Sequence, residues 1–223
     1  MSASAQLVLG GGEEPLRRVR PADDHYRTPP ELADRMLARL CPDRVGSVLD
    51  AGAGGGVLAQ AVVRRQVAAG GPHPVVTAID IDAGRAASWP DDWGGVVGAL
   101  LAWAPGCERL WDLVISNPPF AMEIDGTRRQ NTWTDWALAC LPLLAPGGAL
   151  LLMGFANTLD GQDRVRRLLR PNPPSAVLHC GRWSFTGDGA TDPRDVVWLR
   201  WDAAGPRDLV SSALGLGTRT GWL

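Results

Sequence analysis

Residues 48–56 read VLDAGAGGG and mark the point at which an apolar strand turns into a helix. A strand is expected over 47–50, and apolar residues recur at helical spacing over 57–68. Because glycine has no Cβ, the backbone of this turn can approach a bound molecule closely. The first amide groups of the helix would point into the same space. Such a turn by itself is compatible with a dinucleotide, a nucleotide or a tight turn alone, so the rest of the chain has to decide.

Apolar strands alternate with helices over most of the chain. Further strands are expected at 75–80, 96–97, 111–116, 149–153, 176–180 and 196–201, and further helices at 31–40, 132–144 and 160–169. Thr28 is a candidate for the cap of the helix at 31–40. Alternating strands and helices predict a parallel sheet covered on both faces. The last two strands have no convincing helix between them. We therefore expect a doubly wound α/β fold whose mostly parallel, seven-stranded sheet ends in an antiparallel hairpin.

This pattern delimits one domain at residues 25–202. Residues 1–24 are expected to form a flexible arm, and residues 203–223 a loosely ordered tail. No apolar run reaches the roughly 20 residues that a membrane helix needs. Residues 1–14 also lack the basic and apolar regions of a secretion signal. We therefore expect a cytoplasmic protein that has no membrane partner.

Charge and the distribution of metal-ligating residues narrow the function. The formal net charge is −2, and every basic residue is an arginine. Non-specific binding to nucleic acid is therefore expected to be modest and sensitive to salt. Cysteine and histidine are scattered without the spacing of metal ligands, at Cys41, Cys107, Cys140, Cys180, His25, His73 and His179. We expect reduced thiols and no metal site.

Polar residues follow three of the expected strands. Asp50 directly precedes the glycine-rich turn, where a carboxylate suits a ligand with an ammonium group better than one with a pyrophosphate. Asp80 ends the second strand, where it can accept hydrogen bonds from both hydroxyls of a ribose. Residues 117–120, which read NPPF, end the fourth strand. Because the carboxyl ends of parallel strands meet at one edge of a sheet, the three positions are expected to share one crevice.

These residues resemble the class I S-adenosylmethionine-dependent methyltransferases, and among them the amino-methyltransferases that carry Asn, Asp or Ser before Pro-Pro-aromatic. Residues 48–56 are similar to the first motif of that family and 78–82 to its second. Residues 26–30 resemble an aromatic-x-Thr-Pro motif of some adenine-N6 methyltransferases. The resemblance implies a Rossmann-like methyltransferase fold and S-adenosyl-L-methionine as the cofactor. The residues that it places around the cofactor are Tyr26, Thr28, Asp50, Ala51, Gly52, Gly54, Asp80, Ile81, Ala99, Leu100 and Asn117. Many members of the family have an acidic residue where this chain has Ala99.

The chemistry of residues 117–120 suits methylation of an exocyclic amine. On adenine, the lone pair of such an amine is delocalised into the ring. The side-chain oxygen of Asn117 and the backbone carbonyl of Pro118 can accept its two hydrogens, so that the nitrogen moves towards tetrahedral geometry. Pro118 and Pro119 stiffen the turn, and Phe120 offers a flat face to a flipped base. A rigid turn without a catalytic role is the alternative, but the position after the fourth strand favours catalysis.

Two loops carry the candidate substrate contacts. Arg128 and Arg129, in the expected loop at 121–131, can bind phosphate. Residues 181–192 resemble a loop of small phage-type or prophage-type DNA adenine-N6 methyltransferases. That resemblance implies that Trp183 or Phe185 forms a second wall of a base pocket beside Phe120. Alternatively, both aromatic side chains simply pack on the sheet.

The leading hypothesis is methyl transfer to N6 of adenine, with DNA favoured over RNA as the nucleic-acid partner. We expect no separate target-recognition domain, so recognition would come from loops, a homodimer or a protein partner. An N2-guanine methyltransferase of ribosomal RNA is the first alternative, and a protein glutamine methyltransferase is the second. A cofactor-binding subunit without catalysis is the third, although such proteins usually lose the asparagine or the glycine-rich turn.

Overall fold

The computed structural model describes residues 27–124, 127–130, 132–185, 194–203 and 210–211. The expected arm at 1–24 lies outside the described residues, as do Tyr26 and most of the expected tail. For the short strands at 121–130 and 210–211 only the backbone is described.

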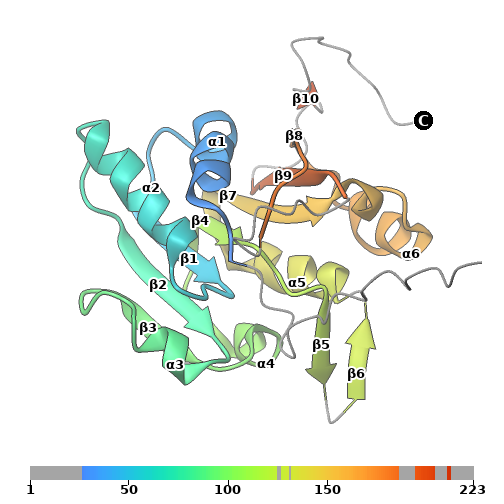
Figure 1. Ribbon diagram of the computed structural model, residues 1–223, viewed down its shortest axis with the longest axis horizontal. Coiled ribbons are helices and arrows are strands. Elements are labelled where there is room, and N and C mark those ends of the chain that lie inside the picture. The colour runs from blue at the N-terminus through green and yellow to red at the C-terminus, as the bar shows by residue number, and fades with distance from the viewer. Residues whose placement is uncertain (1–26, 125–126, 131, 186–193, 204–209, 212–223) are drawn as a thin grey trace, which may run out of the picture.

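One sheet forms the centre of the molecule, with the strand order β10-β8-β9-β7-β4-β1-β2-β3 (Figure 1). Its strands are β1 (Ser47–Ala51), β2 (Val75–Asp80), β3 (Gly94–Val97), β4 (Trp111–Ser116), β7 (Leu144–Phe155), β8 (Ala176–Gly181), β9 (Val196–Asp202) and β10 (Val210–Ser211). The first five pair in parallel, whereas β9 pairs antiparallel with both β7 and β8. The predicted α/β fold, with its mostly parallel sheet and C-terminal antiparallel hairpin, is confirmed. The two-residue β10, parallel to β8, is an addition at the edge.

The central strands are apolar because both of their faces are covered. Val48 of β1 belongs to one core cluster, and its neighbour Leu49 belongs to the cluster on the opposite face. Strand β4 divides in the same way, with Leu113 on the first side and Val114 on the second. Side chains of successive strand residues point to opposite faces, so an unbroken apolar run is what a doubly covered strand requires.

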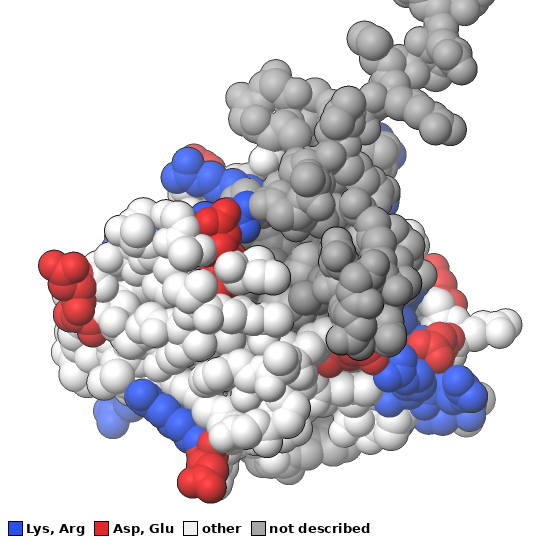
Figure 2. All heavy atoms as spheres, turned by 90° about the horizontal axis from the view of Figure 1, so that it is seen from below, with Lys and Arg blue, Asp and Glu red and all other residues white. Residues whose placement is uncertain are grey.

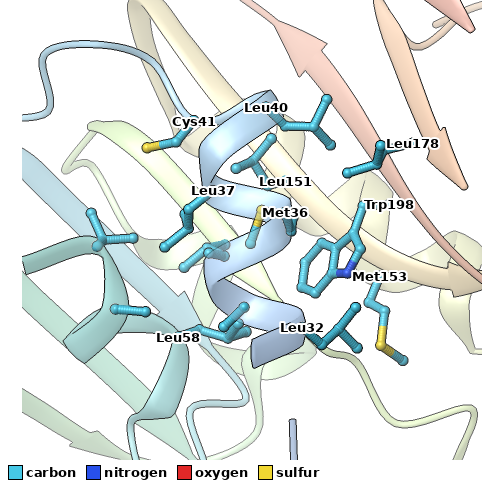
Figure 3. Packing of buried hydrophobic residues seen from close by; sticks show 14 of the residues in the cluster. Leu32, Met36, Leu37, Leu40, Cys41, Leu58, Leu151, Met153, Leu178 and Trp198 are labelled. Atoms are coloured by element: carbon cyan, nitrogen blue, oxygen red, sulfur yellow. The ribbon is translucent and has the colours of Figure 1, made fainter. Parts of the chain in front are cut away.

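Helices α1 (Pro30–Leu40) and α2 (Val57–Ala68) cover the first face. The labelled side chains in Figure 3 show how α1 packs Leu32, Met36 and Leu37 towards Met153 and Trp198 of the sheet. Leu32 and Met36 are both 0% exposed. Thr28, however, is not the cap of α1, because Pro29 occupies the cap position and no side-chain cap hydrogen bond forms.

Shorter helices cover the second face. They are α4 (Leu100–Trp103), α5 (Trp133–Cys140) and α6 (Gln162–Arg164), with a π-helical turn at Val165–Leu169. The short α3 (Ala83–Ala86) packs Ala86 against Ala78 of β2, which points to the face opposite to that of Ile79. The helix predicted at 132–144 ends at Cys140, where a 3-10 turn containing Pro142 follows. The helix predicted at 160–169 begins later, at Gln162, and widens into the π-helical turn.

Two connections differ from the expectation. The predicted loop at 121–131 contains an antiparallel hairpin of β5 (Ala121–Ile124) and β6 (Thr127–Gln130). Strand β7 starts five residues before the predicted strand, at Leu144 rather than Ala149. Its pairing with β4 shifts register between Trp111 and Leu113, and the extra residues before Ala149 form a bulge there.

Candidate active site

A cleft of about 820 Å³, its open mouth included, lies at the carboxyl ends of β1, β2 and β4. The predicted site residues that line it are Thr28, Gly52, Gly54, Asp80, Ile81, Ala99, Leu100, Asn117, Pro118 and Pro119. Ligands of open α/β sheets bind in this type of crevice. The structure therefore brings the glycine-rich turn, the end of β2 and the NPPF segment to one cavity, as the sequence predicted.

Hydrogen bonds from both sides hold the glycine-rich turn. The amides of Gly52 and Ala53 donate to the carbonyl of Ile79, at 2.8 and 2.9 Å. The amide of Gly54 donates to Oδ2 of Asp80 at 2.8 Å, and the carbonyl of Gly54 accepts the indole N–H of Trp89 at 2.8 Å. The amide and the carbonyl of Gly54 are thus both held by residues of the segment from β2 to β3. These two hydrogen bonds fix the backbone conformation of the turn beside the cleft.

The Asp80 carboxylate is the acidic group that lines the cleft. It is 6% exposed, and Oδ1 accepts the amide N–H of Asp82 at 3.0 Å. The guanidinium Nη1 of Arg85 lies 3.5 Å from the same Oδ1, and Arg85 itself lines the cleft. These partners fix the orientation of the carboxylate at the end of β2.

Asp50 and Ala51 lie beneath the turn and do not line the cleft. Asp50 is 0% exposed, and its Oδ2 accepts the amide N–H of Ala59 in the first turn of α2 at 3.0 Å. Burial raises the pKa of Asp50 to about 7, and the nearby charge of Asp80 acts in the same direction. Oδ1 is buried without a hydrogen-bond partner among the described atoms. Asp50 therefore contacts the start of α2, and a direct contact with a ligand stays a prediction.

The NPPF segment is anchored at both ends. Nδ2 of Asn117 donates to Oγ1 of Thr28 at 3.0 Å, which joins the segment to the residue in front of α1. The hydroxyl of Ser116 donates to the carbonyl of Ala51 and accepts the indole N–H of Trp136 at 2.9 Å. The hydroxyl of Thr132 donates to the carbonyl of Pro119 at 3.2 Å. The amide plane of Asn117 consequently has a fixed direction at the wall of the cleft.

Phe120 lies in an aromatic cluster next to the cleft rather than in its wall. Its ring stacks on Phe155, with the centroids 4.7 Å apart and the planes 31° apart. Phe185 meets the same Phe155 ring edge-on at 6.5 Å, and the guanidinium of Arg194 lies 3.6 Å from the Phe155 centroid. The predicted residues Phe120 and Phe185 therefore both contact the ring of Phe155.

The other residues predicted to contact the substrate do not line the cleft. Trp183 and Phe185 pack against the α1 side of the core, and the indole N–H of Trp183 donates to the carbonyl of Cys180 at 3.0 Å. This is the packing that the alternative interpretation expects. Arg128 and Arg129 lie on β6 opposite Glu123 and Met122, and their side chains lie outside the described part of the structure.

Sequence reasoning did not select Arg85, Trp89, Trp136 and Arg194. Arg85 lies in α3, five residues after Asp80, so its position near the second motif was a usable signal. The two tryptophans reach the turn and Ser116 through hydrogen bonds that no local pattern predicts. Within the described residues, no group of three or more His, Cys, Asp or Glu side chains is arranged to hold a metal ion.

Comparison with known proteins shows which sequences resemble this chain. No family model matches the chain. An alignment over 128 residues, which covers 52% of the chain, is 33% identical to the tRNA1(Val) (adenine(37)-N6)-methyltransferase of Edwardsiella ictaluri. The chain spans about half the length of that curated relative, 49% of it.

Solved structures show the same architecture. A Listeria monocytogenes protein assigned to the class I S-adenosylmethionine-dependent methyltransferases superposes with a TM-score of 0.64 at 15% identity, over 86% of this chain and 68% of its own. The methyltransferase subunit of a type I restriction-modification system from Streptococcus thermophilus gives 0.64 at 14% identity, over 83% of this chain and 47% of its own. The chain thus has the Rossmann-like fold found in methyltransferases.

Proposed function

We propose that this chain transfers a methyl group from S-adenosylmethionine to N6 of adenine in a nucleic acid. The observation that carries the proposal is that Asn117, Pro118 and Pro119 of the NPPF segment, the glycine-rich turn and the Asp80 carboxylate line one cleft. The stretch related to a tRNA adenine-N6 methyltransferase supports the same reaction.

The residues of the cleft fit an adenosyl ligand. Asp80 offers a carboxylate to ribose hydroxyls, and the side chains of Ile81 and Leu100 give an apolar lining for a base. Gly52 and Gly54 allow the backbone to approach the amino-acid part of the ligand closely. When bound, S-adenosylmethionine supplies an electrophilic methyl group on a sulfonium.

Asn117 and Pro118 would activate the adenine amine. The hydrogen bond from Nδ2 of Asn117 to Thr28 directs the amide, so its oxygen can accept one N–H of the amine. The carbonyl of Pro118 would accept the other, and the nitrogen lone pair would leave conjugation with the ring. The proton can be lost to water after transfer, so a side-chain base is not required. Holding the amine in line is then the main catalytic contribution of the segment.

DNA is the leading substrate, as the resemblance of the 181–192 loop to small DNA adenine methyltransferases implies. Phe120 would stack on the flipped base, which an enzyme acting on duplex DNA must extrude from the helix. Transfer RNA is the second candidate, favoured by the name of the Edwardsiella ictaluri relative. A homodimer or a protein partner would supplement target recognition in either case.

The test is methyl transfer from labelled S-adenosylmethionine to unmethylated double-stranded DNA, tRNA, ribosomal RNA and a protein extract in parallel. We expect labelled N6-methyladenosine or its deoxy form after digestion to nucleosides. Label in the deoxynucleoside supports DNA, and label in the ribonucleoside supports tRNA. Label only in N2-methylguanosine or in protein glutamine would contradict the proposed reaction.

A further inference from the structure

Arg27 lies at the entrance of the cleft, directly before Thr28 in the chain. Both residues line the cleft, but Thr28 is 5% exposed, whereas Arg27 is open to solvent. Oγ1 of Thr28 accepts the hydrogen bond from Nδ2 of Asn117 at 3.0 Å. A positive charge is therefore placed at the entrance, next in sequence to the residue that contacts the asparagine of the NPPF segment.

Two basic residues line the cleft among those that the structure describes, and their surroundings differ. The guanidinium of Arg85 lies near two carboxylates, with Nη1 3.5 Å from Oδ1 of Asp80 and Nε 3.5 Å from Oδ2 of Asp82. Within the described ranges, no carboxylate lies at ion-pairing distance from Arg27. Arg27 can therefore take up an anion without breaking an ion pair that the structure describes.

Several arginines elsewhere on the surface lie beside carboxylates. Arg64 pairs with Asp34. Arg166 and Arg167 both pair with Asp163. On the face shown in Figure 2, acidic and basic side chains lie in small neighbouring groups, and most of the described surface is uncharged. With a net charge of −2, the chain does not attract a polyanion as a whole, so each phosphate has to be held by a locally placed cation.

The exposure of Arg27 favours a phosphate of a nucleic-acid backbone as its anion. A base that is methylated has to enter the cleft, while the sugar-phosphate backbone of the same strand stays outside and passes over the entrance. The N–H donors of arginine form a planar fork that matches two oxygens of a phosphate. An exposed arginine at the entrance is placed for that backbone, whereas a carboxylate of the cofactor would be enclosed with the rest of that ligand.

We propose that Arg27 binds a phosphate of the nucleic-acid backbone beside the target nucleotide. This inference rests on the proposed function, because it adds a contact with the substrate to the same site. A phosphate held by Arg27 would anchor the strand on the side of the cleft from which α1 starts. The anchored strand could then present its exocyclic amine to Asn117.

The experiment measures steady-state methylation and fluorescence-anisotropy binding of an adenine-containing oligonucleotide, made as DNA and as RNA, over a series of salt concentrations. For Arg27→Gln we expect KM for the methylated oligonucleotide to rise about fivefold and the slope of log K against log salt to fall by about one. The Kd for S-adenosylhomocysteine and the melting temperature should stay at the wild-type values. Arg27→Lys keeps the charge and should keep the salt slope, although it loses the planar fork.

Arg39→Gln is the matched control, because Arg39 is exposed in the last turn of the same helix, α1, and does not line the cleft. It removes the same charge and should leave KM and the salt slope unchanged. If Arg27→Gln behaves like Arg39→Gln while the wild type methylates nucleic acid, this inference is overturned and the proposed function stands.

A second outcome would also overturn the inference. If Arg27→Gln raises the Kd for S-adenosylhomocysteine and keeps the wild-type salt slope, Arg27 binds the carboxylate of the cofactor instead of a phosphate. If the wild type neither binds nor methylates any nucleic acid, the inference and the proposed function are both overturned.

Discussion

Asp50 carries its carboxyl group in the interior, at the end of β1 and under the glycine-rich turn. Its folded pKa of about 7 lies above the ordinary value of 3.8, so the folded state holds the proton more tightly than the unfolded chain. The stabilisation from this group is therefore complete below pH 4 and is lost as the pH rises through 7. We expect the free energy of unfolding to fall by about 1 kcal/mol per pH unit over that interval from Asp50 alone.

Asp50→Asn should remove this pH dependence of the unfolding free energy, because an asparagine side chain does not ionise. Its amide oxygen can still accept the N–H of Ala59. Urea unfolding between pH 5 and 8 measures the effect. Asp91→Asn, at an exposed position, is the control and should reproduce the wild-type slope. A wild-type slope in Asp50→Asn would show that the carboxyl is not the group that titrates.

Some residues of the site could be predicted from the sequence around them, and others could not. Gly52, Gly54, Asp80 and Asn117 were predictable because each belongs to a motif at the end of a strand. Arg194 was not predictable, because its contact with Phe155 joins two segments about 40 residues apart and depends on the pairing of β7 with β9. Asp50 was expected to lie beside the cofactor. Its side chain instead accepts a hydrogen bond at the start of α2 and does not line the cleft.

The start of α2 depends on a glycine with positive φ. Gly56 has a φ of 75° and occupies the cap position, and a Cβ there would lie 2.7 Å from Cζ3 of Trp93. Gly70 has the same φ of 75°, but a Cβ there would meet no other group within 4 Å. Gly70→Ala should cost about 1 kcal/mol of unfolding free energy from backbone strain. Gly56→Ala should cost at least about 1 kcal/mol more, since Trp93 must also move.

Urea unfolding of the two alanine variants compares these costs directly, because the backbone strain is common to both. Equal losses would mean that Trp93 yields freely and does not restrict the turn.

The β2–β3 region holds the turn through the indole of Trp89. Trp89→Phe removes the donor to the buried Gly54 carbonyl and should lower stability by about 1–3 kcal/mol. Since Gly54 lines the cleft, we also expect the Kd for S-adenosylhomocysteine to rise several-fold in calorimetric titration. Trp201→Phe is the matched control, because its indole donates to the carbonyl of Asn172 at 2.8 Å, away from the cleft.

The control should lose a similar amount of stability and keep the wild-type Kd. An unchanged Kd in Trp89→Phe would assign Trp89 a purely structural role.

Long, strongly patterned elements were predictable from the sequence, and short ones were not. The bounds of α2, β2 and β4 agree with the prediction residue for residue, because apolar runs and turn residues delimit them. Helices α3 and α4 have four residues each, too few to show a period. The β5–β6 hairpin was missed because β6 is polar throughout and neither four-residue strand shows the alternation of a half-buried sheet.

At the scale of the whole molecule, the topology explains why the site could be foreseen. Strands β1, β2 and β4 are neighbours and parallel, so residues separated by up to 65 positions, such as Ala51 and Ser116, meet at one edge. No helix in the described ranges is long and apolar enough to cross a membrane. The parts that the sequence could not supply are side-chain contacts across the core, such as the stack of Arg194 on Phe155.

The central claim is that Asn117 activates an exocyclic amine beside a bound S-adenosylmethionine. Its most direct test measures methyl transfer to nucleic acid and S-adenosylhomocysteine binding in Asn117→Ala and in Asn117→Asp, which keeps an oxygen acceptor. We predict that Asn117→Ala lowers kcat by about 100-fold or more while the Kd stays within a few-fold of the wild type. Asn117→Asp should retain intermediate activity. Wild-type kcat in Asn117→Ala, with the cofactor bound normally, would contradict the account.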